Sequence, residues 1–286
     1  MKHSSLKAKL KKQVWEKPDY YYGSRKEIRK IFFGNPALVK LLEYSHKGGS
    51  ILDCGCGDGR IIEILWRKEA NFRGFDISER AIKLAKKRLK SKKNVDLKVG
   101  DIEKINFPDE TFDMVYTTYT LEHLNKPEKV IEEMVRVTKK GGYLILISPN
   151  YGSPFHPSGS SLPSGESLLS RAVKIFLKSH LYLLKKPNNL AWVKVEPKVL
   201  KEGKWQSDWD TIIEPSLQTL LIFLKKKGVA MIENSSGITT NNLKIGVSLR
   251  QKILSIVRRI FEFLGNQGVP PYKYFGPTLM VVGRKK

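Results

Sequence analysis

The chain has 286 residues, of which 41% are hydrophobic and 28% charged, enough for one large domain with an ordinary buried core. This composition excludes a mini-protein and a chain that is disordered throughout. The 52 Lys and Arg residues outnumber the 28 Asp and Glu residues, and the net charge of +24 creates a field that attracts polyanions. Both halves contribute, with +11 up to residue 150 and +13 after it.

The only two cysteines, Cys54 and Cys56, are too close in sequence to close a disulfide loop and too few for a zinc site. Residues 1–13 are basic but lack the continuous apolar segment of a signal peptide. No stretch approaches 18 apolar residues in a row. We therefore expect a cytoplasmic protein, whose only contact with a membrane would be peripheral, on the inner face.

The N-terminal region, residues 1–47, predicts a basic arm followed by cap helices. Its first 22 residues are rich in lysine and end in three tyrosines, and we expect this arm to close onto the domain over a ligand. Between residues 25 and 46 the apolar positions are broken by Gly34-Asn35-Pro36, which predicts two short helices.

From residue 48 to 150 short apolar runs alternate with helical segments, which is typical of a parallel sheet with helices on both faces. This region therefore predicts an α/β core of Rossmann-like type. We expect helices from about 59, from Ser78 as N-cap to about 91, and from about 127 to 139. The predicted strands are 50–54, 71–76, 95–99, 112–117 and 143–148.

The second half predicts an insertion followed by completion of the sheet. Residues 151–214 form the insertion or lid, which begins with a loop rich in Pro, Ser and Gly and continues as a basic amphipathic helix at 166–186. Residues 215–286 are expected to complete the sheet and to carry a second basic amphipathic helix at about 247–264. Their other predicted elements are a helix at 215–227 and strands at 229–234 and 277–283.

A glycine-rich turn follows the first predicted strand. Gly55, Gly57 and Gly59 alternate there, and glycine lets a backbone turn tightly and approach a ligand without a Cβ clash. The dinucleotide fingerprint needs its last glycine at position 60, where Arg60 stands, so a pyrophosphate grip is disfavoured. The turn by itself is also compatible with a purely structural connection.

Acidic residues stand at successive strand ends, where open parallel sheets bind their ligands. Asp53 stands one residue before the end of the first predicted strand, Asp76 ends the second, and Asp101 follows the third. Asp76 is placed to accept two ribose hydroxyls, and Asp101 is placed to meet an adenine amino group. Each acid alone would suit a solvated loop, but the three together favour a nucleoside site.

Five motifs, in order and at matching spacing, resemble the class I S-adenosylmethionine-dependent methyltransferases, in the group that includes quinone-biosynthesis and bacterial glycan-cluster enzymes. The resemblance is strong over residues 48–150 and weak over 208–286. It implies a seven-stranded sheet whose last strand is antiparallel and inserted beside strand five. It also implies S-adenosyl-L-methionine as cofactor and S-adenosyl-L-homocysteine as product. No metal is expected, because no cluster of carboxylates and His stands out at ligand spacing. The motifs are LDCGCGDGR (52–60), GFDIS (74–78), VGDIEKINFPDETFDMVYTTYTLEHLNKP (99–127), VTKKGGYLILISPN (137–150) and GPTLMVVGRKK (276–286).

The resemblance also implies roles for individual residues. Cys54 and Cys56 replace the commoner small or aliphatic residues of the turn, and we interpret them as packing residues. The cofactor would be bound by Asp53 at its amino group, Gly55 and Gly57 along its methionyl part, Asp76 at its ribose, Ile77, Asp101 and the Ile102 backbone at its adenine, and Thr117 beside its methionine.

Methyl transfer from a sulfonium is an in-line displacement, so alignment and exclusion of water matter most, and a general base is needed only for a hydroxyl or a protonated nitrogen. The candidate bases are His123, after the fourth predicted strand, and His156, in the lid loop. For His123, a structural contact near the cofactor is the stronger explanation. Trp205 and Trp209 could stack on an acceptor ring or pin the insertion to the core.

Three interpretations of the positive charge are open: binding of nucleic acid, contact with an anionic membrane, or a lysine-rich proteome. No target-recognition module or Asn-Pro-Pro-Tyr-like motif supports nucleic acid, whereas the two basic amphipathic helices favour a membrane surface.

The predicted function is methyl transfer to a small-molecule, glycan-lipid or quinone-like acceptor. The alternatives are methylation of RNA or protein, and a non-catalytic binding protein of the same fold. The acceptor atom and the oligomeric state stay open.

Overall fold

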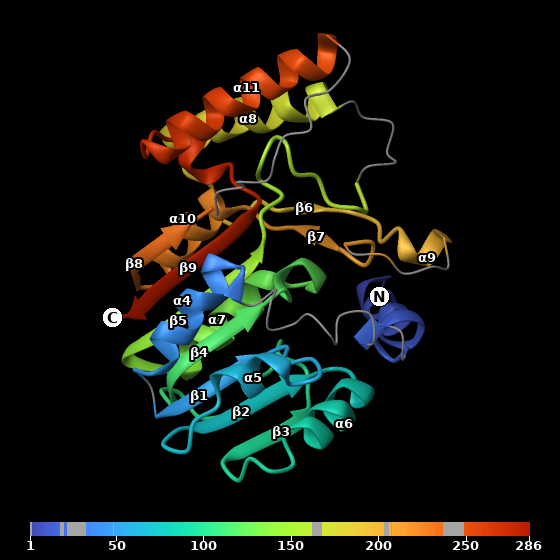
Figure 1. Cartoon of the computed structure of the whole chain (residues 1–286), viewed down its shortest axis with the longest axis vertical. Coiled ribbons are helices and arrows are strands. Elements are labelled where there is room, and N and C mark those ends of the chain that lie inside the picture. Colours follow the sequence, from blue (N-terminus) through green and yellow to red (C-terminus); the bar gives the residue numbers. More distant parts are fainter. Residues whose placement is uncertain are drawn as a thin grey trace.

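The structure is a computed structural model of the whole chain. It describes residues 2–17, 20–21, 33–47, 49–161, 168–202, 206, 208–236 and 249–286. Its central layer is a seven-stranded sheet in the order β3-β2-β1-β4-β5-β9-β8 (Figure 1). The strands are β1 (Ser50–Cys54), β2 (Asn71–Asp76), β3 (Val95–Val99), β4 (Phe112–Thr118), β5 (Thr138–Pro149), β8 (Val229–Ser235) and β9 (Thr278–Lys285).

The first five strands are parallel, and the last strand of the chain runs against them. β1 pairs in parallel with β2 and β4, and the parallel ladder continues to β3 on one side and to β5 on the other. β9 lies between β5 and β8 and is antiparallel to both. The predicted sheet, with an antiparallel last strand beside strand five, is therefore confirmed.

Helices cover both faces of this sheet because successive strand residues point to opposite sides. In β5, Leu144 and Leu146 belong to one buried cluster, and Ile145 and Ile147 belong to the other. The first cluster packs against α7 (Pro127–Val137) and α10 (Leu217–Lys226), whereas the second packs against α4 (Pro36–Ser45), α5 (Arg60–Leu65) and α6 (Glu79–Arg88).

Two helices begin at side chains that cap their first turn, and the second of these caps, Ser78, was predicted. The Asn35 side chain accepts from the Ala37 N–H and begins α4, and the Ser78 hydroxyl accepts from the Ala81 N–H and begins α6, as predicted. These caps satisfy N–H groups that have no partner within the helix. α6 ends at Arg88, three residues before the expected end.

The boundary between α7 and β5 differs from its prediction. We expected the helix to continue to about 139 and the strand to begin at 143, but the helix ends at Val137 and the strand begins at Thr138. Thr138 is already extended and pairs with Phe112. Gly141 then takes a φ of +72°, and the ladder shifts register before Met114. The Lys-Lys-Gly-Gly segment thus forms an irregular strand start.

The N-terminal arm consists of α1 (Lys2–Leu10) and a π-helical turn, η1 (Lys11–Trp15). Its buried residues Leu10, Val14 and Trp15 pack with Val199 and Ile212 of the insertion. The predicted closure of the arm onto the domain is therefore confirmed for the residues that the structure describes. The insertion contributes α9 (Val199–Glu202) and a two-stranded sheet of β6 (Val193–Lys194) and β7 (Ile213–Glu214).

Two long helices, α8 (Leu168–Leu184) and α11 (Leu249–Asn266), lie together at one end of the molecule, beyond the edge of the sheet formed by β8 (Figure 1). Rings of Phe176 in α8 and Phe261 in α11 lie 5.7 Å apart. Among the described residues, no helix combines the length and the apolar character needed to cross a membrane.

Candidate functional site

A cavity of about 510 Å³ opens at the carboxyl ends of the parallel strands, the edge where such sheets bind ligands. Its volume lies within the range of small-molecule sites. Four sheet segments and the arm line it. They are Gly55–Asp58 after β1, Asp76 and Ile77 at the end of β2, Gly100–Ile102 after β3, Thr118–Thr120 with His123 and Leu124 after β4, and Lys7, Trp15, Tyr20 and Tyr21 from the N-terminal region.

The glycine turn brings bare backbone to the cavity. Gly55 and Gly57 have φ values of +83° and +52°, in the left-handed region that favours glycine. A Cβ at Gly55 would lie 2.5 Å from the Thr120 hydroxyl, so that glycine is required for packing. A Cβ at Gly57 would meet no protein atom within 4 Å. Because Gly57 lines the cavity, such a Cβ would project toward the space of a ligand.

Asp76 joins this turn to the start of α6. Its Oδ2 accepts from the Gly57 N–H at 2.9 Å, and its Oδ1 accepts from the Ser78 N–H at 2.8 Å. Burial raises the pKa of Asp76, and the two N–H donors partly offset that effect. Each carboxylate oxygen keeps lone-pair capacity beyond these bonds, so Asp76 can accept hydroxyl groups from a ligand in the cavity.

Asp101 has a partner in the N-terminal arm. The Lys7 ammonium lies 2.7 and 2.8 Å from its two carboxylate oxygens and 3.4 Å from Glu103. Sequence reasoning did not identify Lys7, because nothing in a lysine-rich arm distinguishes one lysine from the next. The carboxylate predicted to accept from adenine is thus close to both the cavity and the arm.

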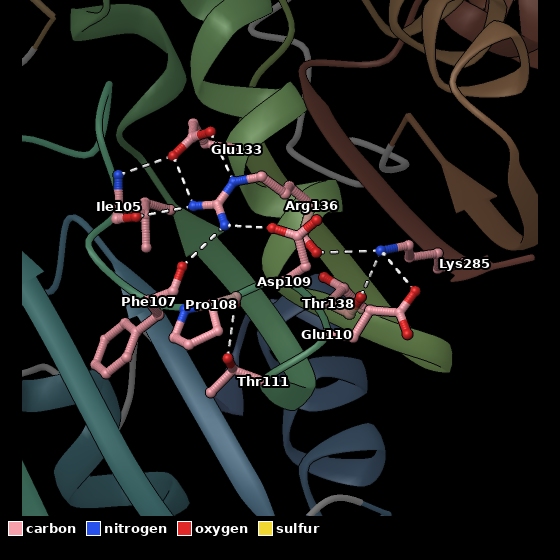
Figure 2. A network of polar contacts seen from close by, with 10 residues as sticks. All are labelled: Ile105, Phe107, Pro108, Asp109, Glu110, Thr111, Glu133, Arg136, Thr138 and Lys285. Atoms are coloured by element: carbon pink, nitrogen blue, oxygen red, sulfur yellow. Dashed lines mark hydrogen bonds and ion pairs between the residues drawn. The ribbon is translucent and has the colours of Figure 1, made fainter.

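Arg136 anchors the segment that follows Asp101 and Ile102 (Figure 2). Its guanidinium makes two 2.9 Å bonds to Glu133 and one of 2.8 Å to Asp109. It also donates to the carbonyl oxygens of Ile105 and Phe107, each at 2.8 Å. Hydrogen bonding to the Glu133 carboxylate is the main cause that raises the pKa of Arg136. This network attaches the loop after β3 to α7.

Arg60, which excludes the dinucleotide fingerprint, ties the glycine turn to the arm. It binds both carboxylate oxygens of Asp58, at 2.7 and 2.8 Å, and donates to the Tyr21 carbonyl at 3.1 Å. Arg88 binds the same carboxylate at 2.9 Å. Burial raises the pKa of Asp58, but the two guanidinium groups outweigh burial and lower it overall. Sequence reasoning gave Asp58 no role.

His123 lines the cavity and lies among buried carboxylates. Its Nδ1 is 3.2 Å from the Asp210 carbonyl oxygen and 3.6 Å from Asp210 Oδ2, and its Nε2 is 3.8 Å from Glu122. Burial lowers the pKa of His123, but the two carboxylates outweigh this and raise it. Asp210 Oδ2 also accepts from Trp15 Nε1 and the Tyr20 hydroxyl, each at 3.1 Å. Asp210 therefore holds the arm over the cavity beside His123.

Three predicted site residues do not line the cavity. Asp53 is buried, accepts from the Tyr116 hydroxyl at 2.8 Å, and has its pKa raised by burial to about 7. The Thr117 hydroxyl donates to the Cys54 carbonyl, and Thr118 lines the cavity in its place. His156 stacks on Tyr151 with ring centroids 5.7 Å apart. The other predicted residues, Gly55, Gly57, Asp76, Ile77, Asp101, Ile102 and His123, all lie at the cavity.

Other side chains considered from the sequence have packing roles. Cys54 and Cys56 are buried, and burial raises the pKa of both thiols. Trp209 packs with the arm and receives the Lys198 ammonium 4.0 Å from its ring centroid, whereas Trp205 lies outside the described residues. Within the described part of the chain, no group of three His, Cys, Asp or Glu residues is arranged to hold a metal ion.

Comparison with known proteins agrees with this geometry. Residues 52–146 match the family described as "Methyltransferase domain". The chain is 31% identical over 191 residues to ajmaline N-methyltransferase of Rauvolfia serpentina, covering 64% of this chain and 62% of that protein. It is 32% identical over 127 residues to a ubiquinone biosynthesis O-methyltransferase of Coxiella burnetii, covering 43% and 54%. The alignments thus span less than two thirds of the length of these relatives.

A solved S-adenosylmethionine-dependent methyltransferase from Mesorhizobium loti superposes with a TM-score of 0.54 at 16% identity, covering 87% of this chain and 96% of that one. This likeness shows the fold. Residues 52–146 thus match a methyltransferase domain, and the relatives and the fold support a class I S-adenosylmethionine-dependent methyltransferase, in agreement with the resemblance seen in the motifs.

Proposed function

We propose that this protein transfers the methyl group of S-adenosylmethionine to a small-molecule or lipid-linked acceptor. One observation carries the proposal: Gly57 presents open backbone to a cavity in which Asp76 holds the same glycine's N–H at 2.9 Å. The turn and the carboxylate at the ends of β1 and β2 therefore form one preorganised unit rather than two unrelated loops.

The cavity offers partners for the ribose and the adenine of this cofactor. Asp76 would accept the ribose hydroxyls, and Ile77 and Ile102 supply apolar walls for the adenine. Asp101 stands where an amino group of the base would approach, with Lys7 beside it. Asp53, which was predicted to orient the amino group, does not line the cavity, although its buried Oδ1 has no hydrogen-bond partner among the described residues. When bound, the cofactor supplies an electrophilic methyl on a sulfonium.

The protein's own contribution is alignment and exclusion of water. The arm covers the cavity with Trp15 and Tyr20, both bonded to Asp210. His123 would be the base if the acceptor needs one, and the carboxylates of Asp210 and Glu122 beside it raise its pKa.

For the acceptor, we propose a ring-bearing molecule. Trp15, Tyr20, Tyr21 and Tyr119 give the cavity an aromatic wall on which a planar ring can stack. Two relatives support this choice, because they are named for ajmaline and for ubiquinone biosynthesis, and both names refer to ring-bearing molecules. The same acceptor class includes quinone-like lipids.

The test is product formation with methyl-labelled S-adenosylmethionine and three acceptor pools: phenolic quinone precursors, lipid-linked sugars and total RNA. We expect label in one of the first two pools, released together with S-adenosylhomocysteine. The Gly57→Val variant, which blocks the turn, should abolish it. Label found in RNA alone would contradict the proposed acceptor class.

A further inference from the structure

The pair of helices α8 and α11 is held together by an aromatic cluster. Phe261 lies 5.7 Å from Phe176, 4.9 Å from Tyr272 and 5.9 Å from Phe275, measured between ring centroids. On another side of α8, Arg171 pairs with Glu214 at 3.0 Å. The sides of α8 that face α11 and the domain are thus accounted for by packing.

The outward side of α8 is apolar and exposed. Val173, Leu177, Leu181 and Leu184 have relative exposures of 48%, 57%, 61% and 88%. Residues spaced by three and four share one face of a helix, so these four side chains form a single stripe. Within the part of the chain that the structure describes, nothing covers this stripe.

The outward side of α11 repeats the pattern. Ile256, Ile260 and Phe263 are exposed to 58%, 50% and 63% and follow the same spacing. We call these three residues and the four on α8 the outer apolar face. Monomeric soluble proteins scatter exposed apolar side chains singly, whereas a gathered set marks an interaction site.

Positive charge surrounds the outer apolar face. Lys174, Lys178 and Lys185 are exposed on or just after α8, Arg259 is exposed on α11, and between them the two helices contain one acidic residue, Glu262. A separate cavity of about 490 Å³ adjoins the end of α8 at Tyr182 and Leu183. Four lysines and no acidic residue line it: Lys186, Lys225, Lys226 and Lys273.

We propose that the outer apolar face docks on an anionic lipid bilayer, with α8 and α11 lying in the plane of the interface. An amphipathic helix with basic flanks buries its apolar stripe at the boundary between headgroups and acyl chains, and its lysines attract anionic lipid. A second copy would bring two positive surfaces together, and nucleic acid would place polar phosphates on leucine side chains, so neither matches this face.

Docking is independent of the cofactor cavity, since none of the seven face residues lines it. Where the proposed methyl transfer also holds, docking would bring a lipid-borne acceptor within reach of the enzyme; this last step rests on the proposed function. The two proposals can therefore fail separately.

The test is flotation of the full chain with vesicles of phosphatidylcholine alone and of an equal mixture of phosphatidylcholine and phosphatidylglycerol. The parent should bind the mixed vesicles, with binding weakened by salt. The double variant Leu181→Gln/Phe263→Gln should lose about tenfold or more in partition coefficient, since each change removes a large apolar side chain from the bilayer. Removing Lys178 and Lys185 should cost about fivefold for each charge.

A matched control is Val99→Gln/Ile232→Gln. These two side chains are exposed to a similar degree, 47% and 46%, but lie on β3 and β8 at opposite edges of the sheet. This control should partition as the parent does, and both double variants should keep their affinity for S-adenosylmethionine. Equal flotation of the parent and the helix variant, absence of binding to mixed vesicles, or a parent dimer that the helix variant dissociates would overturn the docking proposal.

Discussion

Gly57 and Asp76 are joined by one backbone hydrogen bond, and through it the first two strand ends act as a single site. A glycine is needed at position 57 for two separable reasons. Its backbone is left-handed, and a Cβ there would occupy open space beside the cavity. Only the second reason concerns a ligand. The two reasons can be tested separately, because Gly141 shares the left-handed backbone of Gly57 but does not line the cavity.

The Gly57→Val variant should lose cofactor binding by about 100-fold or more, because its side chain would enter the cavity at the backbone's closest approach. Gly141→Val is the matched control, since Gly141 also has a positive φ, +72°, and also meets nothing within 4 Å, but does not line the cavity. Both variants pay backbone strain of about 1–2 kcal/mol, visible in thermal unfolding. Calorimetry with S-adenosylmethionine separates them; equal affinities in the two variants would exclude a ligand at Gly57.

The predicted site residues that line the cavity are those set by the turn and by strand ends. Gly55, Gly57, Asp76 and Asp101 occupy fixed positions relative to a strand, so their arrival at one edge follows from parallel topology. Asp53 and Thr117 precede the ends of their strands by a residue, and pleating turns their side chains into the core. That alternation explains why Thr118 lines the cavity and Thr117 does not.

At the scale of elements, the loop from β3 to β4 carries Asp101 and Ile102 and has little regular structure of its own. Arg136 holds it by bonds to two carbonyl oxygens and two carboxylates (Figure 2). Such a network depends on a residue 35 positions away from Asp101 in the sequence. No local pattern reveals it, so the sequence predicts the loop but not its anchor.

Arg136→Ala should destabilise the protein by about 2–3 kcal/mol, because it removes charge-assisted hydrogen bonds and leaves two loop carbonyls without their partner. It should also weaken cofactor binding severalfold, since the loop that lines the adenine side loses its anchor. Arg73→Ala is the control, because Arg73 forms a half-exposed pair with Asp96 at 3.5 Å and does not line the cavity. Denaturant unfolding and calorimetry measure the two effects. A stability loss with unchanged affinity would show that the anchor serves folding alone.

For the whole molecule, the alternation of apolar runs and helical segments predicted a parallel sheet with helices on both faces. Its seven strands and its antiparallel last strand were implied by the family resemblance of the motifs. The arm was predicted to close on the domain, but its contacts were not. Trp15 and Tyr20 reach Asp210, almost 200 residues later in the chain. The closure depends on this long-range contact between the N-terminal arm and the insertion. No local pattern in the sequence reveals such a contact.

The charge of the whole molecule is divided between two surfaces with different roles. The cavity contains three acidic side chains, Asp58, Asp76 and Asp101, and Arg60 and Lys7 in its lining pair with the first and the last of them. The outer apolar face has exposed basic residues beside aliphatic ones. This basic face suits a polyanionic surface.

Binding of S-adenosylmethionine in the cavity is best tested by calorimetric titration of the purified parent and its Asp76→Ala variant with S-adenosylmethionine and S-adenosylhomocysteine, with NAD as the control ligand. We expect micromolar binding of the first two ligands to the parent, none of NAD, and a loss of about 10- to 100-fold in the variant, whose ribose partner is gone. Asp96→Ala, an acid outside the cavity, should bind as the parent does. A parent that binds none of these ligands, or a variant with unchanged affinity, would contradict the account.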